Sequence, residues 1–569
     1  MIVNLKFDWF TTTKADNSKQ RRENNMKKIA PGLAVMKLSR TWFAIVIMVL
    51  CVNTLTAAPQ DNDGAATQAD GIQRTKPVIT DRGVIRGKTV DNVDQFLGVP
   101  YAAAPIGALR WRAPIPAASW HGVRDATKPA CPCAQIDLNK GIQSGSEDCL
   151  YLNIYRPENI RHGQSPPVLV WIHGRNNTNG SGNDYDPSEM VEKTEIIVVT
   201  VNYRLTVFGF LALLSLDEES DDSSSGNYGL LDQQAALRWV QRNIGAFGGD
   251  PHNVTIAGES AGADNVCANL VSPTAAGLFK KAIMQSGRGC ATATHAEVTQ
   301  TGAMIATDLG CADPNTAAVC LRAKAPADLL EAAKTRLFGP NISGRALPLQ
   351  LVDAVRSNQW NRSPILLGST HDYASPVIAR VGFPLSVQSY EQFVTLRFKS
   401  LAPAVLNGYK LESYPDPAYA FSAENTDSEI ACKASHLAKL FSEMMTETYQ
   451  YEFNDPDAPP PSPEKTGLNI PPGVSLGSYH GSELQYLFKF SEASRDLSPT
   501  QEQLSDQMMQ YWANFARTGN PNGPGIVHWP LYNPDTPLVL SFKPGGNTVI
   551  DNFDAAHRCA FWVHAAPTN

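Results

Sequence analysis

Three short, almost purely apolar runs stand out along the chain, at residues 168–172, 196–201 and 253–258. Each run is followed by glycine or polar residues, as is typical of buried central strands in a parallel sheet. Between the second and third runs, residues 229–247 place apolar side chains at helical spacing. Strands that alternate with helical stretches predict an α/β protein with a central, mostly parallel sheet flanked by helices.

The first 58 residues predict a leader that precedes the folded protein. A basic flank at 37–40 is followed by a short apolar core at 42–52 and by small residues at 56–58, which is the arrangement of a secretory signal peptide. The apolar core is shorter than the roughly 20 residues of a comfortable membrane span, although a retained signal anchor is the alternative. Met26 and Met36 are alternative start sites.

The rest of the sequence predicts a linker followed by one large domain. Residues 59–76 are polar and predict a disordered linker, and residues 77–569 carry motifs that belong to a single catalytic unit with large insertions. The formal net charge of -7 is small for 569 residues, so composition gives no reason to expect nucleic acid as a partner. No second apolar run of spanning length follows the leader, so we expect no membrane attachment after signal removal.

Ser260 is the candidate nucleophile. It is the central residue of Gly258–Gly262, a G-x-S-x-G pattern that directly follows the third apolar run and precedes a helix-compatible stretch at 263–270. This strand–turn–helix context is the one in which a serine stands on a tight turn, exposed to substrate. The N–H of Ala261 would then face the developing oxyanion from the start of the helix.

These residues resemble the type-B carboxylesterase and cholinesterase family. Gly258–Gly262 is similar to the family's active-site signature, and Glu147–Ile154 is similar to its second signature. Further matches lie at 96–101, 202–204, 208–212, 227–233, 247–251, 285–287 and 519–521. The resemblance runs from about Val78 to Trp562. It implies an α/β-hydrolase fold, a serine esterase that acts on small-molecule esters, and no cofactor.

The same resemblance identifies His480 as the base. Residues 479–484 resemble the family's catalytic-histidine segment. A serine hydroxyl needs a base during acyl transfer, and imidazole has a suitable pKa. The chain order, Ser260 before His480, agrees with α/β-hydrolases.

The third triad member departs from the family pattern. In the segment Gly368–Ala374, Tyr373 stands where the family has Glu or sometimes Asp. A neutral phenol can orient an imidazole, but it supplies no negative charge opposite an imidazolium, and such a loss costs about 10⁴-fold in kcat in well-studied triads. The adjacent Asp372 is the alternative acid, although a shift of one residue normally redirects a side chain.

The oxyanion loop departs as well. The family usually has His-Gly-Gly-Gly, whereas this chain has His-Gly-Arg-Asn-Asn at 173–177. Gly174 is retained, but Arg175 and Asn176 replace two glycines and carry a Cβ where left-handed dihedrals are expected. Losing one oxyanion donor costs about 10²–10³-fold. Alternatively, the Arg175 guanidinium could stabilise negative charge itself or bind a carboxylate on the substrate.

The chain has ten cysteines. The resemblance implies three disulfides, which are Cys133–Cys149, Cys311–Cys320 and Cys432–Cys559. With the predicted signal peptide they favour a secreted or periplasmic protein, and reduced cytosolic thiols are the alternative. The cysteines without an implied partner are Cys51, Cys131, Cys267 and Cys290. No metal site is predicted, because the isolated Cys131-Pro132-Cys133 lacks metal-ligand spacing.

Two functions remain open at this point. The first is a serine carboxylester hydrolase that uses Ser260 and His480. The second is a catalytically impaired relative that serves as a binding or adhesion scaffold, which the changes at Tyr373, Arg175 and Asn176 motivate. Substrate specificity and oligomeric state do not follow from the sequence.

Overall fold

The computed structural model describes residues 72–569 except for 138–140, 162, 291, 492–495 and 566–569. The described residues belong to one compact unit, Ala65–Asn569. The predicted leader (1–58) and residues 59–71 of the predicted linker (59–76) lie outside the described residues.

An eleven-stranded sheet organises this unit, in the order β20-β19-β17-β16-β13-β12-β9-β11-β8-β4-β3. Its neighbouring parallel strands are β11 (Ile197–Val201), β9 (Val168–Ile172), β12 (Val254–Glu259), β13 (Lys281–Gln285), β16 (Ile365–Thr370), β17 (Thr448–Phe453) and β19 (Val539–Phe542). The antiparallel outer strands are β8 (Tyr151–Pro157), β4 (Val93–Pro100), β3 (Lys88–Val90) and β20 (Thr548–Ile550). The three apolar runs of the sequence thus become three neighbouring central strands, which confirms the predicted mostly parallel sheet.

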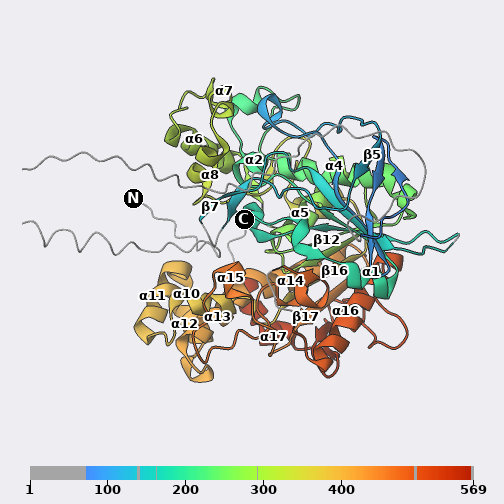
Figure 1. Ribbon diagram of the computed structural model, residues 1–569. Helices are drawn as coiled ribbons and strands as arrows, with labels where there is room; N and C mark the ends of the chain where they lie inside the picture. Colours follow the sequence, from blue (N-terminus) through green and yellow to red (C-terminus); the bar gives the residue numbers. More distant parts are fainter. Residues whose placement is uncertain (1–71, 138–140, 162, 291, 492–495, 566–569) are drawn as a thin grey trace, which may run out of the picture. The chain divides into compact units, whose positions relative to one another are not determined.

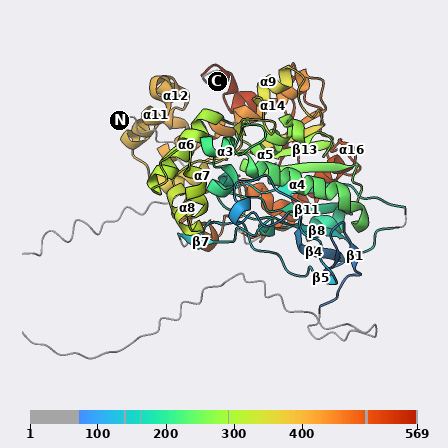
Figure 2. The ribbon, with the colours of Figure 1, turned by 90° about the horizontal axis from the view of Figure 1, so that it is seen from above.

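Helices cover both faces of the sheet (Figures 1 and 2). Successive side chains of β9 alternate between two hydrophobic clusters, with Val168 and Val170 in one and Leu169 and Trp171 in the other. The first cluster packs against α4 (Tyr228–Asn243), α5 (Ala261–Val271), α9 (Leu351–Arg356) and α14 (Cys432–Glu443). The second packs against α1 (Ser188–Thr194) and α16 (Pro499–Thr518). Each fully buried Val or Leu side chain contributes about 1.5–3 kcal/mol to stability.

Large insertions follow the carboxyl ends of the parallel strands. One group after β11 and β13 contains α2 (Thr206–Phe210), α3 (Leu214–Asp217), α6 (His295–Asp308), α7 (Ala317–Arg322) and α8 (Pro326–Ala333), and these helices share their own hydrophobic cluster. A second group after β16 contains α10 (Ile378–Val381), α11 (Val387–Phe398), α12 (Ala402–Gly408) and α13 (Pro417–Thr426). Ligand sites of open α/β sheets lie at these carboxyl ends, and Figure 1 shows both groups near one end of the sheet.

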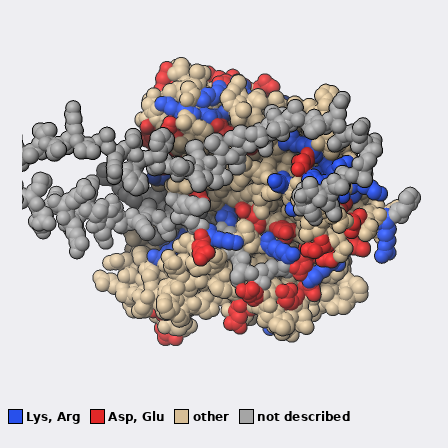
Figure 3. All heavy atoms as spheres, in the orientation of Figure 1, with Lys and Arg blue, Asp and Glu red and all other residues tan. Residues whose placement is uncertain are grey.

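The remaining α-helices and strands are short. They are the helices α15 (Pro463–Thr466), α17 (Phe553–Ala556) and α18 (Cys559–Ala565), and the minor strands β1 (Val78–Ile79), β2 (Val84–Arg86), β5 (Val123–Asp125), β6 (Gln135–Asp137), β7 (Ile142–Ser144), β10 (Tyr185–Asp186), β14 (Ala293–Thr294), β15 (Asn341–Ile342) and β18 (Lys489–Phe490). On the face that Figure 3 shows, Lys and Arg are interspersed with Asp and Glu over the uncovered surface.

The structure forms the three disulfides that the family resemblance implies, at Cys133–Cys149, Cys311–Cys320 and Cys432–Cys559. It also forms a fourth, Cys267–Cys290, which links α5 to the segment after β13 and which the sequence reasoning missed. Within the described part of the chain, no helix combines the length and the apolar character needed to cross a membrane.

Candidate active site

Ser260 stands on a strained turn between β12 and α5. Its backbone has φ 57° and ψ -126°, a region that a residue with a side chain rarely adopts. The flanking glycines make the turn possible, because a Cβ on Gly262 would lie 2.1 Å from the carbonyl oxygen of Ile172 and a Cβ on Gly258 would lie 2.6 Å from the backbone of Gly262. The Ser260 N–H donates to the carbonyl of Gln285 at 2.8 Å, which fixes the turn against β13.

The N–H groups around Ser260 come from two elements. Ala261 is the first residue of α5, so its N–H has no partner within the helix and lies at the positive end of the helix dipole. Gly174 follows β9 and lies directly beside the nucleophile, because a Cβ on it would come within 3.1 Å of the Ser260 Cβ. The loop that begins at Gly174 therefore borders Ser260.

This loop adopts the left-handed conformation without the usual glycines. Arg175, Asn176 and Asn177 have φ values of 65°, 55° and 57°. Hydrogen bonds hold Asn177 in place, since its Oδ1 accepts from the Tyr203 hydroxyl at 3.1 Å and from the Asn265 amide at 2.7 Å. A non-glycine residue with these dihedrals raises the conformational free energy by about 1–3 kcal/mol, so the surrounding contacts must stabilise the loop by at least as much.

His480 contacts the residue next to the nucleophile. Its Nε2 lies 3.2 Å from Oε1 of Glu259, and its Nδ1 is buried without a hydrogen-bond partner among the described residues. Burial, together with a smaller contribution from the nearby Arg288 guanidinium, lowers the pKa of His480 to about 3. A neutral imidazole with its proton on Nε2 would direct that proton at Glu259, whereas a base for Ser260 needs a free lone pair on Nε2.

Tyr373 occupies the position of the family's acid. Its ring packs on the His480 imidazole with the two centroids 4.3 Å apart, and the residue is 3% exposed. Burial raises the pKa of Tyr373, and Arg288 opposes that rise only in part, so the phenol carries no charge near neutral pH. Tyr373 therefore fills the space beside the imidazole without supplying a negative charge.

Asp372 points elsewhere. Its Oδ2 accepts a hydrogen bond from the N–H of Ser478 at 3.0 Å. The structure thus brings Tyr373 to the His480 ring and uses Asp372 to hold the backbone that leads to His480. The carboxylate of Asp372 is not hydrogen-bonded to the imidazole, because Nδ1 of His480 has no such partner in the described chain.

Sequence reasoning missed two charged residues of this site. Glu259 lies inside the G-x-S-x-G pattern, and its contact with His480 follows from no local spacing. Arg288 comes directly after the matched segment 285–287, and its Nε lies 3.5 Å from Oδ2 of the buried Asp264 on α5. Glu259 thus stands within a recognised motif and Arg288 directly after one, and this proximity is the signal that could have marked them.

Comparisons with known proteins identify the family. A model of the carboxylesterase family matches residues 74–562. Cocaine esterase of Oryctolagus cuniculus is 34% identical over 527 residues, which cover 86% of this chain and 95% of that protein. Acylcarnitine hydrolase of Mus musculus is 32% identical over 530 residues, which cover 86% and 91%. A solved structure of PNB esterase has a TM-score of 0.71 at 32% identity and covers 85% of this chain and 99% of its own. The chain therefore belongs to the carboxylesterase family, as a carboxylic ester hydrolase with the α/β-hydrolase fold.

Proposed function

We propose that the chain hydrolyses small-molecule carboxylic esters through an acyl-enzyme on Ser260, with His480 as the general base. The Ser260 Oγ attacks the ester carbonyl while His480 accepts its proton on Nε2 and then passes that proton to the leaving alcohol. Water attacks the acyl-enzyme by the same route and releases the acid. The N–H groups of Ala261 and of the loop at 174–176 donate to the oxyanion in both steps.

The observation that carries this proposal is the strained turn at Ser260. Ser260 has a φ of 57°, which is rare for a residue with a side chain, and its two flanking glycines make this turn possible. The turn places Ser260 at the N-terminus of α5 and next to Gly174. Backbone strain of this kind is retained where it positions a reacting group. The names of the relatives, which include cocaine esterase and acylcarnitine hydrolase, support a small ester as the substrate class.

We also propose that turnover is slower than in a serine esterase with a complete triad. No carboxylate within the described chain is hydrogen-bonded to Nδ1 of His480, and the Glu259 contact favours the tautomer with a proton on Nε2. Catalysis then requires the proton to move to Nδ1 before Nε2 can act as a base. Loss of the third triad member in other serine hydrolases lowers kcat by about 10⁴-fold.

The disulfides support an oxidising compartment for this activity. Four of them lie within the described chain, and such bonds persist in secreted or periplasmic proteins rather than in the cytosol. We therefore propose that the enzyme is secreted or periplasmic.

Labelling with a fluorophosphonate and turnover of p-nitrophenyl acetate test the mechanism together. We expect the wild type to form an adduct on Ser260, and Ser260→Ala to lose both the adduct and the turnover. The matched control is Ser357→Ala, which removes an exposed serine at the end of α9 and should leave both readouts unchanged.

Two results would contradict the proposal. Residual turnover in Ser260→Ala at the wild-type level would place the reaction elsewhere. A folded wild type that forms no adduct and hydrolyses no ester would favour the scaffold alternative, in which the fold is kept for binding.

A further inference from the structure

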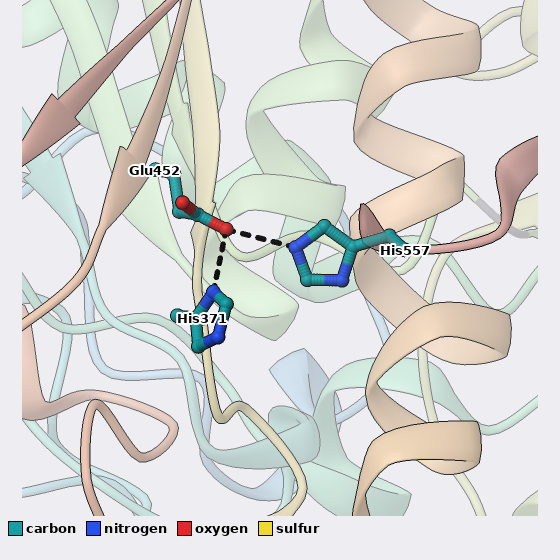
Figure 4. Close-up of side chains that lie close together, drawn as sticks. All are labelled: His371, Glu452 and His557. Atoms are coloured by element: carbon teal, nitrogen blue, oxygen red, sulfur yellow. Dashed lines mark hydrogen bonds and ion pairs between the residues drawn. The ribbon is translucent and has the colours of Figure 1, made fainter. Parts of the chain in front are cut away.

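Outside the active site, two histidines and a glutamate from separate segments converge on one point (Figure 4). His371 follows β16, Glu452 lies on the neighbouring β17, and His557 follows α17. Oε1 of Glu452 is 2.8 Å from Nδ1 of His371 and 2.8 Å from Nε2 of His557. The nitrogen and oxygen atoms that could bind a metal all lie within 4.8 Å of one another.

A second carboxylate contacts the other ring nitrogen of His557 and orients the ring. Oδ1 of Asp427 lies 2.6 Å from Nδ1 of His557, and the Tyr409 hydroxyl donates to the other oxygen of Asp427 at 2.6 Å. Histidines that bind metals commonly donate their second ring N–H to a carboxylate, which fixes the ring and directs the free nitrogen to the ion. His557 has this arrangement, with Nε2 directed at Glu452.

The cluster is buried on one side and open on the other. The side chains of Glu452 and His557 are 4% exposed, whereas that of His371 is 39% exposed. A cavity of about 410 Å³ borders His371 and His557. Asp372 and Asp427 also line this cavity, and Arg558 approaches Asp427 to 3.7 Å. An ion could enter from this side and keep water in its remaining coordination positions.

We propose that His371, Glu452 and His557 bind one divalent transition-metal ion, with Zn²⁺ as the best fit. Two imidazole nitrogens and one carboxylate oxygen are the donor set of three-ligand zinc sites, which leave a fourth position for water. Tetrahedral zinc with ligand bonds of about 2.0–2.2 Å separates neighbouring ligand atoms by ~3.3 Å, so the present 2.8 Å contacts need to widen by only about 0.5 Å. On binding, Nδ1 of His371 and Nε2 of His557 both give up the hydrogen that is directed at Glu452 to solvent. Each ring stays neutral, with its proton on Nε2 of His371 and on Nδ1 of His557, where Asp427 accepts it.

No sequence pattern indicates this site, because its three ligands are far apart along the chain and none stands in a metal-binding motif. The site also lies close to the candidate active site along the chain. Tyr373, which packs on His480, comes two residues after His371, so a bound ion would tether the turn that carries Tyr373.

Zinc binding to the untagged full chain tests the proposal. After treatment with a chelator, the protein is titrated with Zn²⁺ by calorimetry, and the bound metal is counted by elemental analysis after dialysis. The main variant is His371→Ala, because this side chain is the most exposed of the three ligands and its removal disturbs the core least. The control is His252→Ala, which removes an exposed histidine from another surface.

We expect about one equivalent of zinc in the wild type and in His252→Ala, and at least about tenfold weaker binding in His371→Ala. A Co²⁺ titration should give the strong visible absorption of a four-coordinate site in the wild type, and this band should be lost in His371→Ala. A wild type that binds no zinc, or a His371→Ala variant that binds zinc as tightly as His252→Ala, would overturn the proposal. The thermal unfolding transition, followed by circular dichroism, reports independently whether each variant is folded.

Discussion

Replacing Tyr373 by glutamate should increase esterase activity. The phenol ring lies over the His480 imidazole at a centroid distance of 4.3 Å, and Nδ1 of that imidazole has no hydrogen-bond partner within the described chain. A carboxylate at position 373 would accept a hydrogen bond from the Nδ1–H, which keeps the proton on Nδ1 and leaves the Nε2 lone pair free to take the proton of Ser260. The variant Tyr373→Glu thus changes both the tautomer and the charge beside the base.

The size of the effect follows from the same distance. At 4.3 Å and an effective dielectric constant of about 20, a carboxylate stabilises an imidazolium by about 4 kcal/mol. Since each 1.36 kcal/mol is worth a factor of ten in rate, the expected gain in kcat/KM approaches ~10³-fold. Arg288, which lowers the pKa of His480, would attract the same carboxylate and reduce the gain. We therefore expect an increase of between about 10-fold and 10³-fold.

The assay compares wild type, Tyr373→Glu and Tyr373→Gln with p-nitrophenyl acetate. Glutamine has nearly the size of glutamate and can accept the same hydrogen bond, but it carries no charge. The ratio between the two variants therefore isolates the charge from the loss of the ring. If Tyr373→Glu is folded, labels with fluorophosphonate, and is no faster than Tyr373→Gln, the electrostatic reasoning is refuted.

Three further predictions rest on other parts of the structure. Because the pKa of His480 lies near 3, kcat/KM of the wild type should stay flat from pH 7 down to about pH 5; a fall centred near 6.5 would contradict this. Burial raises the pKa of Glu424 to about 9, so the folded state holds a proton that the unfolded state releases above about pH 4.5, and stability falls as pH rises through this window. Glu424→Gln should therefore raise Tm at pH 8.5 relative to wild type and change it little at pH 4, as calorimetry can measure; an unchanged difference across this range would refute the assignment. The Cys432–Cys559 bond joins residues 127 apart, so replacing both by serine should lower the free energy of unfolding in urea by about 4–5 kcal/mol, and a loss below 1 kcal/mol would contradict the chain-entropy argument.

The central sheet was predictable because its strands are buried on both faces. Residues 168–172 are apolar without interruption since helices cover both sides of β9, and such a run needs no tertiary information to be recognised. The turn at Ser260 was predictable for a related reason. Ile172 and the backbone of the turn itself approach the two glycines so closely that no side chain fits there. The turn therefore leaves a recognisable pattern within five consecutive residues.

The electrostatics of the site were not predictable in the same way. Glu259 approaches His480 across more than two hundred residues of chain, and Arg288 affects the same imidazole from the segment after β13. The direction of the Asp372 side chain likewise depends on the backbone at Ser478, which only the folded chain brings near. These contacts depend on tertiary placement, and no periodicity or spacing in the sequence encodes them. The sequence did identify Tyr373 as the unusual residue, and the structure shows what it packs against.

Three backbone hydrogen bonds hold the turn after β16. The N–H of His371 donates to the carbonyl of Phe453 at 2.9 Å, that of Asp372 to the carbonyl of Ser478 at 3.1 Å, and the carbonyl of Tyr373 accepts from the N–H of His480 at 3.2 Å. None of these bonds involves the side chain at position 373, so a replacement of that side chain removes none of them. In evolutionary terms, a lineage could give up or recover the charge beside its catalytic base through one amino-acid replacement, while the rest of the fold remained under unchanged selection.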